Sequence, residues 1–148
     1  MFIDTGAKMS LAQNFVDLLN QCLNSSQECI DSCQKVVDMC SGRDFEDCGK
    51  EIGILVSRAT ECIKFCERAK SHAQDYLKIC KDSHCTELVQ KFIDKSQKCV
   101  DHCNAVIMQC EQRTAFCISS TFDCLKACTE LTEAIAALTG NKILIGDQ

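Results

Sequence analysis

Apolar residues and cysteines recur along this chain in steps of three, four and seven, which is the repeat of one face of an α-helix. The chain has no proline and only six glycines, so long stretches are free of helix-breaking residues. The pattern predicts four helices, covering about residues 10–40, 50–81, 84–112 and 114–140. We expect an all-α fold with a single domain over residues 1–148, its bundle over about 10–138 and an irregular tail over 139–148.

Residues that favour helix ends stand where the periodicity stops. Ser10 and Thr114 are expected to be the N-caps of the first and fourth helices, and Asp82–Ser83 a break followed by a cap. Gly140 is expected to end the fourth helix, and the stretch 41–49 to form the first connection. The residues other than cysteine that are expected to point inward are Leu11, Phe15, Leu18, Val36, Ile52, Leu55, Ala59, Ala73, Leu77, Leu88, Phe92, Ile107, Ile118, Leu125, Leu131, Ile135 and Leu138.

The cysteines follow the helical repeat closely. There are fifteen of them, and four pairs have the spacing C-x-x-x-C, one on each predicted helix. Most of the others lie seven or fourteen residues from a member of such a pair. The four pairs are Cys29/Cys33, Cys62/Cys66, Cys99/Cys103 and Cys124/Cys128. The remaining cysteines are Cys22, Cys40, Cys48, Cys80, Cys85, Cys110 and Cys117.

These positions predict an antiparallel four-helix bundle. In an antiparallel hairpin, the residue numbers of facing positions add up to a constant. The cysteines give 95 for the first and second helices, 165 for the second and third, and 227 for the third and fourth. Each constant places the turn in a predicted connection, so we expect the four C-x-x-x-C pairs at one level of the bundle. Cys48 fits a different constant, 88, with Cys40, and its place stays open.

Composition and charge exclude several classes of protein. The net charge of −5 and the lack of a basic stripe argue against a nucleic-acid partner. No apolar run approaches the roughly 18 residues that a membrane span needs. The N-terminal segment has no basic region followed by an apolar one, so no export signal is visible. We expect a cytoplasmic protein without a membrane partner, although an exported form with its signal removed would look the same.

So many cysteines would ordinarily indicate a secreted disulfide scaffold. The odd count, the length of the chain and the scarcity of turn residues oppose that interpretation. Cysteines four apart on one helix face would also form strained disulfides. We therefore expect inward thiols that bind metal.

The spacing favours Cu(I) among the soft metals that thiolates bind, which are Cu(I), zinc and iron–sulfur clusters. Cu(I) accepts two or three sulfurs and can bridge neighbouring sites, which suits a continuous row of thiols. Structural zinc sites need four convergent ligands and usually use C-x-x-C clips, and the chain contains no C-x-x-C. The same absence argues against thioredoxin-type and ferredoxin-type motifs.

Four helices that each carry an inward C-x-x-x-C, with further cysteines seven residues away, resemble the bacterial copper storage proteins. The resemblance covers about residues 10–138, and the lack of a signal resembles the cytosolic branch of that family. It implies a homotetramer of four-helix bundles that holds many Cu(I) ions on core thiolates, with a copper chaperone as the candidate delivery partner. It also implies that copper enters at a bundle end lined by Met or His, for which Met39 and Met108, or His84 at the other end, are the candidates. All fifteen cysteines are candidate ligands, Cys48 being the one that fits the motif poorly.

We therefore expect a copper storage or buffering protein and not an enzyme. Two alternatives stay open. A thiol-redox protein would have exposed cysteines of low pKa beside Lys or Arg. A zinc or iron–sulfur bundle would have convergent sets of four sulfurs in place of a string.

Overall fold

The chain folds into four long α-helices joined by short connections. The computed structural model describes the backbone of residues 3–42 and 45–140, and the side chains of residues 12–42 and 47–140. The helices are α1 (Ile3–Cys40), α2 (Gly49–Leu77), α3 (Ser83–Glu111) and α4 (Cys117–Gly140), with a short 3₁₀ helix, η1 (Phe45–Cys48), before α2. The expected tail beyond Gly140 lies outside the described residues.

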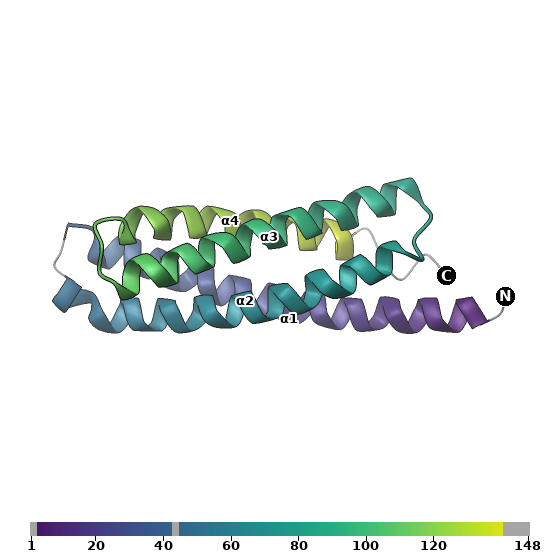
Figure 1. The fold of residues 1–148 in the computed structure, drawn as a ribbon, viewed down its shortest axis with the longest axis horizontal. Coiled ribbons are helices and arrows are strands. Elements are labelled where there is room, and N and C mark those ends of the chain that lie inside the picture. The colour runs from purple at the N-terminus through teal and green to yellow at the C-terminus, as the bar shows by residue number, and fades with distance from the viewer. Residues whose placement is uncertain (1–2, 43–44, 141–148) are drawn as a thin grey trace.

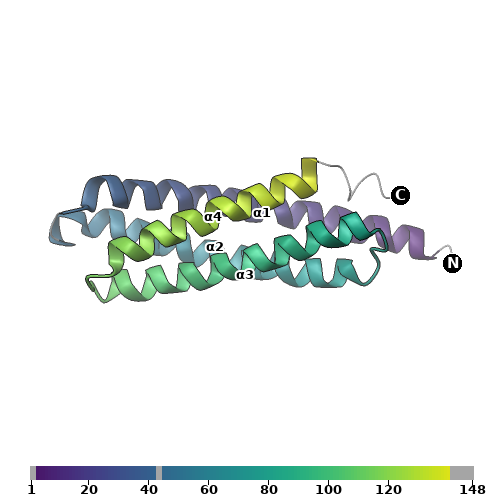
Figure 2. The same cartoon turned by 90° about the horizontal axis from the view of Figure 1, so that it is seen from above.

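The helices run alternately up and down and form an antiparallel four-helix bundle (Figures 1 and 2). Each helix packs against two neighbours: α1 against α2 and α4, and α3 against α2 and α4. One end of the bundle holds η1 and the α3–α4 turn, and the other holds the α2–α3 turn and the start of α1 (Figure 1). The predicted fold class is confirmed.

Two predicted helix ends were wrong. Helix α1 begins at Ile3, so Ser10 lies inside the helix and is not its N-cap. Nothing from Ile3 to Ser10 breaks a helix except Gly6, whose propensity cost a long helix can absorb. Helix α2 ends at Leu77, four residues before the predicted end at Lys81, because the chain must reverse before the extended backbone of Asp82.

At the other two connections, the predicted turn residues do accept hydrogen bonds from backbone N–H groups near the start of the next helix. Asp82 is the N-cap of α3, and its side chain accepts a hydrogen bond from the backbone N–H of His84 at 3.4 Å. The hydroxyl of Thr114 accepts a hydrogen bond from the N–H of Phe116 at 3.1 Å, although α4 itself begins at Cys117. Arg113, in the same turn, has a φ of 53°, the left-handed conformation that commonly ends a helix.

The core has a cysteine-rich body and a conventional apolar end. Phe15 packs against the rings of Tyr76 and Phe92, with centroid distances of 5.5 and 5.9 Å. We call this the aromatic end, and Leu131, Ile135 and Leu138 are fully buried in the same half of α4. Several inward positions differ from the prediction by one residue: the buried side chains are Leu19, Val89 and Val106, whereas Leu18, Leu88 and Ile107 are half-buried. Leu11 lies outside the residues whose side chains are described.

Candidate metal centre

All fifteen cysteines are buried, as the helical pattern predicted, and eleven of them are free thiols. Each element contributes them from its inward stripe, because steps of four and seven return to one side of a helix. Free cysteine behaves as a small apolar residue, so burying thiols in the interior costs little free energy. The bundle thus places its soft ligands where water is excluded.

Eight of the free thiols form one connected group, which we call the sulfur string. It starts at Cys22 Sγ, which lies 3.5 Å from Cys66 Sγ. Cys62 Sγ follows, 3.7 Å from the sulfurs of both Cys66 and Cys99. Cys99 Sγ lies 3.3 Å from Cys128 Sγ. The remaining members are Cys103, Cys124 and Cys29.

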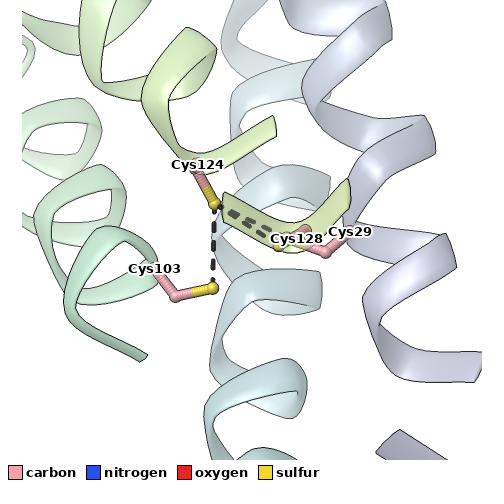
Figure 3. Close-up of side chains that lie close together, drawn as sticks. All are labelled: Cys29, Cys103, Cys124 and Cys128. Atoms are coloured by element: carbon pink, nitrogen blue, oxygen red, sulfur yellow. Dashed lines mark hydrogen bonds between the residues drawn. The ribbon is translucent and has the colours of Figure 1, made fainter. Parts of the chain in front are cut away.

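The far part of the string centres on Cys124. Its sulfur lies 3.7 Å from that of Cys103, 3.9 Å from that of Cys128 and 3.9 Å from that of Cys29. Figure 3 shows these four side chains converging from three helices, α1, α3 and α4, onto one point in the core. Such convergence is the arrangement that a soft metal ion requires.

Two sets of four sulfurs are compact enough to hold a metal ion. In each set the four sulfurs lie within 4.8 Å of one another, and every residue is buried. The first set is Cys29, Cys103, Cys124 and Cys128, and the second is Cys62, Cys99, Cys103 and Cys128. Because Cys103 and Cys128 belong to both sets, the two sites are fused.

The register of α1 differs from the prediction by seven residues. Cys66 faces Cys22 and not Cys29, and Cys62 faces the hydroxyl of Ser26 at 3.6 Å. The facing numbers of α1 and α2 therefore add up to 88, the constant that Cys40 and Cys48 had indicated. A shift of seven residues is two helical turns, about 10.5 Å. The C-x-x-x-C pairs of α2, α3 and α4 meet at one level. The pair on α1 is displaced from its predicted position, although the sulfur of Cys29 still lies 3.9 Å from that of Cys124.

The other predicted pairings agree with the structure. Between α3 and α4, the close pairs Cys99–Cys128 and Cys103–Cys124 have the predicted constant of 227. Between α2 and α3, Cys62 and Cys103 belong to one compact set, in agreement with the predicted constant of 165. The sequence pattern therefore placed three of the four helices correctly relative to one another.

Hydrogen bonds among the thiols lower the pKa of some members of the string and raise the pKa of others. Hydrogen bonds from Cys103 and Cys128 lower the pKa of Cys99 to about 6. Bonds from the same two thiols lower the pKa of Cys124 and of Cys62. The donors must retain their protons, and the pKa of Cys103 and that of Cys128 are correspondingly raised, with burial adding to the effect. The string therefore contains thiols of lowered and of raised pKa side by side.

Three free cysteines lie beside or beyond the string. Cys33 follows Cys29 on α1, and its pKa is raised by hydrogen bonds with Cys124 and Cys29 and by burial. Cys80 and Cys85 flank the α2–α3 turn and are both buried. Neither belongs to a compact set of four sulfurs in the described part of the chain.

The last four cysteines are not thiols in this structure. Cys40 is bonded to Cys48 and Cys110 to Cys117, each pair as a disulfide. Their Cα atoms lie 5.7 and 4.6 Å apart, within the usual range for disulfides, because each pair faces its partner directly across a connection. The expectation that these four are free thiols was wrong for this state, and in it they offer no thiolate to a metal.

The candidates for copper access are on the surface. Met39 is 44 % exposed near the end of α1, and Met108 is 53 % exposed near the end of α3. His84 is exposed in the first turn of α3. In the part of the chain that the structure describes, His84 belongs to no compact set of His, Cys, Asp or Glu ligands.

Buried hydroxyls were missed by the sequence analysis. Ser26 is fully buried, and it occupies an inward position of α1 at which a cysteine would add one more sulfur to the row. Thr121 is fully buried on α4, 3.8 Å from the sulfur of Cys110, and donates a hydrogen bond to the carbonyl of Cys117. The available signal was their spacing, since Ser26 lies four residues after Cys22 and Thr121 four residues after Cys117.

The comparisons with known proteins place the chain in no family. No family model, no curated protein and no solved structure matches it. Within the described residues, none of the helices combines the length and the apolar character that a membrane crossing requires. Any function must therefore be argued from the cysteines themselves.

Proposed function

We propose that this bundle stores or buffers Cu(I) on the thiolates of its core, with no catalytic role. The observation that carries the proposal is the fusion of the two compact sets through Cys103 and Cys128. The two sets contain six different cysteines, because four and four share two. Separate tetrahedral sites would need eight, so two ions held here must share bridging thiolates.

Shared thiolates favour a metal that accepts few sulfurs and bridges readily. Cu(I) is such a metal, and soft thiolate ligands select it. The string continues from the fused sets to Cys66 and Cys22, with contacts of 3.5–3.7 Å. Such a row can take several ions side by side. The resemblance of the C-x-x-x-C pattern to bacterial copper storage proteins supports the same proposal, including its expected tetramer and chaperone partner.

Zinc is the second candidate. A tetrahedral site with Zn–S bonds of about 2.3 Å has its sulfurs about 3.8 Å apart. The sulfurs of each compact set lie within 4.8 Å of one another, which is near that spacing. One zinc ion per bundle, or two with bridging thiolates, would suit this geometry, whereas a longer series of ions would not. The thiol-redox alternative has less support, because every free cysteine is buried.

A metal titration separates the candidates. The fully reduced, metal-free protein is titrated anaerobically with Cu(I) against a chelator of known affinity, and in parallel with Zn²⁺. We expect many equivalents of Cu(I) to bind without a change in helix content by circular dichroism. Because each thiol must lose its proton, loading releases protons and weakens at low pH. Saturation at one or two equivalents of either metal would reject storage and favour the zinc site.

A further inference from the structure

The two disulfides lie at the same end of the bundle, which we call the disulfide end. Cys40 ends α1 and is bonded to Cys48, the N-cap of α2. Cys110 lies in the last turn of α3 and is bonded to Cys117, the first residue of α4. Each disulfide therefore joins the end of one helix to the start of the next. Both connections stand at the end opposite the α2–α3 turn (Figure 1).

The disulfide end lies close to the sulfur string along both α3 and α4. Cys110 follows Cys103 by seven residues, and Cys117 precedes Cys124 by seven, a separation of about 10.5 Å along each helix. Val106 and Thr121, both fully buried, occupy the inward positions between them. A metal ion arriving from this end meets the bonded sulfurs first and the string one layer later.

The other end of the core is closed by large side chains. Phe15, Tyr76 and Phe92 fill the core there with no exposed surface, and Phe15 contacts both of the other rings. A close-packed aromatic layer excludes an ion with its hydration or carrier ligands. The layer between the disulfide end and the string holds the smaller side chains of Val106 and Thr121, so we take the disulfide end as the side of access.

A hollow of about 300 Å³ leads from the surface to one of the two disulfides. Cys110 lines it, together with Gly49 and Gly53 of α2 and the cationic Arg113. A Cβ atom added at either glycine would meet no other atom within 4 Å, so this side of α2 is open. Glu111 and Arg113 both line the hollow, so its rim carries one charge of each sign beside Cys110.

We propose that the Cys110–Cys117 disulfide is a reversible redox switch that controls access of metal to the sulfur string. The inference rests on the proposed function and adds its regulation. In the oxidised state a covalent bond ties α3 to α4 across the disulfide end. In the reduced state the end is untied, so that Cu(I) can pass inward to the sulfur string.

The co-reactant is a dithiol reductant. One of its thiolates attacks Cys110 Sγ, the S–S bond to Cys117 breaks, and Cys117 leaves as a thiolate that takes up a proton. The second thiol of the reductant then attacks the mixed disulfide and releases Cys110 as a thiol. The reductant ends as an intramolecular disulfide, so two electrons and two protons have passed to the protein. Cys117 is a favourable leaving group because the start of a helix stabilises a thiolate.

The switch is tested by the rate of Cu(I) loading under anaerobic conditions. Oxidised protein, with eleven thiols, is compared with protein reduced by a dithiol and freed of it, with fifteen. Thiol titration after unfolding verifies each count, before and after loading. We expect the oxidised protein to load at least several-fold more slowly than the reduced one.

Two double variants identify the disulfide that matters. Cys110→Ser with Cys117→Ser is expected to load at the fast rate without a reductant. The matched control, Cys40→Ser with Cys48→Ser, keeps the Cys110–Cys117 bond and is expected to stay slow until reduced. Circular dichroism verifies that both variants keep the helix content of the parent.

The outcomes separate the switch from the storage function. Equal loading rates in the oxidised and reduced proteins would overturn the switch while leaving storage intact. A Cys110–Cys117 bond that a dithiol cannot reduce in the folded protein would overturn it as well. No copper binding in either state would overturn the storage function and this inference with it.

Discussion

The sulfur of Cys99 lies 3.3 Å from the sulfur of Cys128, across the interface of α3 and α4. Cys128 also lies 3.9 Å from Cys124 and belongs to both compact sets of four sulfurs. A single side chain is thus shared by the two parts of the fused site. Its removal should affect more than one bound ion.

Cys128→Ser should lower the Cu(I) capacity by more than one equivalent. The change removes one sulfur from each set and leaves three in both. A buried hydroxyl without a full partner costs about 1–3 kcal/mol, so unfolding of the metal-free variant must be measured beside the titration. The control is Cys80→Ser, a buried free cysteine outside both sets, which should lose one equivalent at most. Equal losses in the two variants would contradict the fused site.

Ser26→Cys should raise the capacity or the affinity for Cu(I). The hydroxyl of Ser26 is fully buried, 3.6 Å from Cys62 Sγ, so a thiol there adds a ligand beside the string. The matched control is Ser32→Cys, also buried on α1, which lines a surface hollow with Glu28 and Arg58. The chelator competition should shift for the first variant and stay unchanged for the second. A shift in both variants would mean that a thiol added anywhere on α1 strengthens Cu(I) binding, and would contradict a specific role for the position of Ser26.

Phe92→Leu should weaken the fold without changing the metal capacity. Phe92 is fully buried at the aromatic end, where it packs edge-on against Phe15 at 5.9 Å. A hydrophobic substitution of this kind costs about 1–1.5 kcal/mol in the free energy of unfolding, measured by denaturant titration of the metal-free protein. The number of Cu(I) equivalents should equal that of the parent. A lower capacity would mean that the aromatic end helps to form the site.

The ion pair between Lys95 and Glu130 should make part of the stability depend on pH. Lys95 Nζ donates to Glu130 Oε1 at 2.9 Å, and this hydrogen bond with the lysine charge lowers the pKa of Glu130 below 4.5. A lowered carboxylate pKa adds stability that is complete above the unfolded-state pKa and is lost as the pH falls through the folded-state pKa. Glu130→Gln should lower the Tm slightly at neutral pH and by less below about pH 4. A difference that does not shrink in acid would reject the ion pair as its cause.

The sequence predicted the bundle because cysteine and apolar positions share one helical repeat. The pairing of α3 with α4 followed directly, since Cys99, Cys103 and Cys110 face Cys128, Cys124 and Cys117 across a short turn. A short turn permits only one register between two antiparallel helices that carry this cysteine spacing. The convergence of sulfurs from these helices was therefore readable before the structure.

The register of α1 was not readable in the same way. A lattice with steps of seven maps onto itself when a helix slides by seven residues, so Cys22 and Cys29 are equivalent by spacing alone. The longer connection after Cys40 allows both positions. The structure selects the one that brings Cys40 to Cys48, and Cys22 then reaches Cys66. The disulfides were missed because spacing does not distinguish two facing thiols from a bonded pair.

The most direct test of the account is a crystal structure of the Cu(I)-loaded protein with anomalous scattering measured at the copper edge. The account predicts several copper peaks in a row from Cys22 and Cys66 through the fused sets to Cys29, each bound only by sulfur. Neighbouring peaks should share the sulfur of Cys103 or of Cys128. A single peak in one set of four sulfurs, or copper bound outside the core, would contradict storage on the sulfur string.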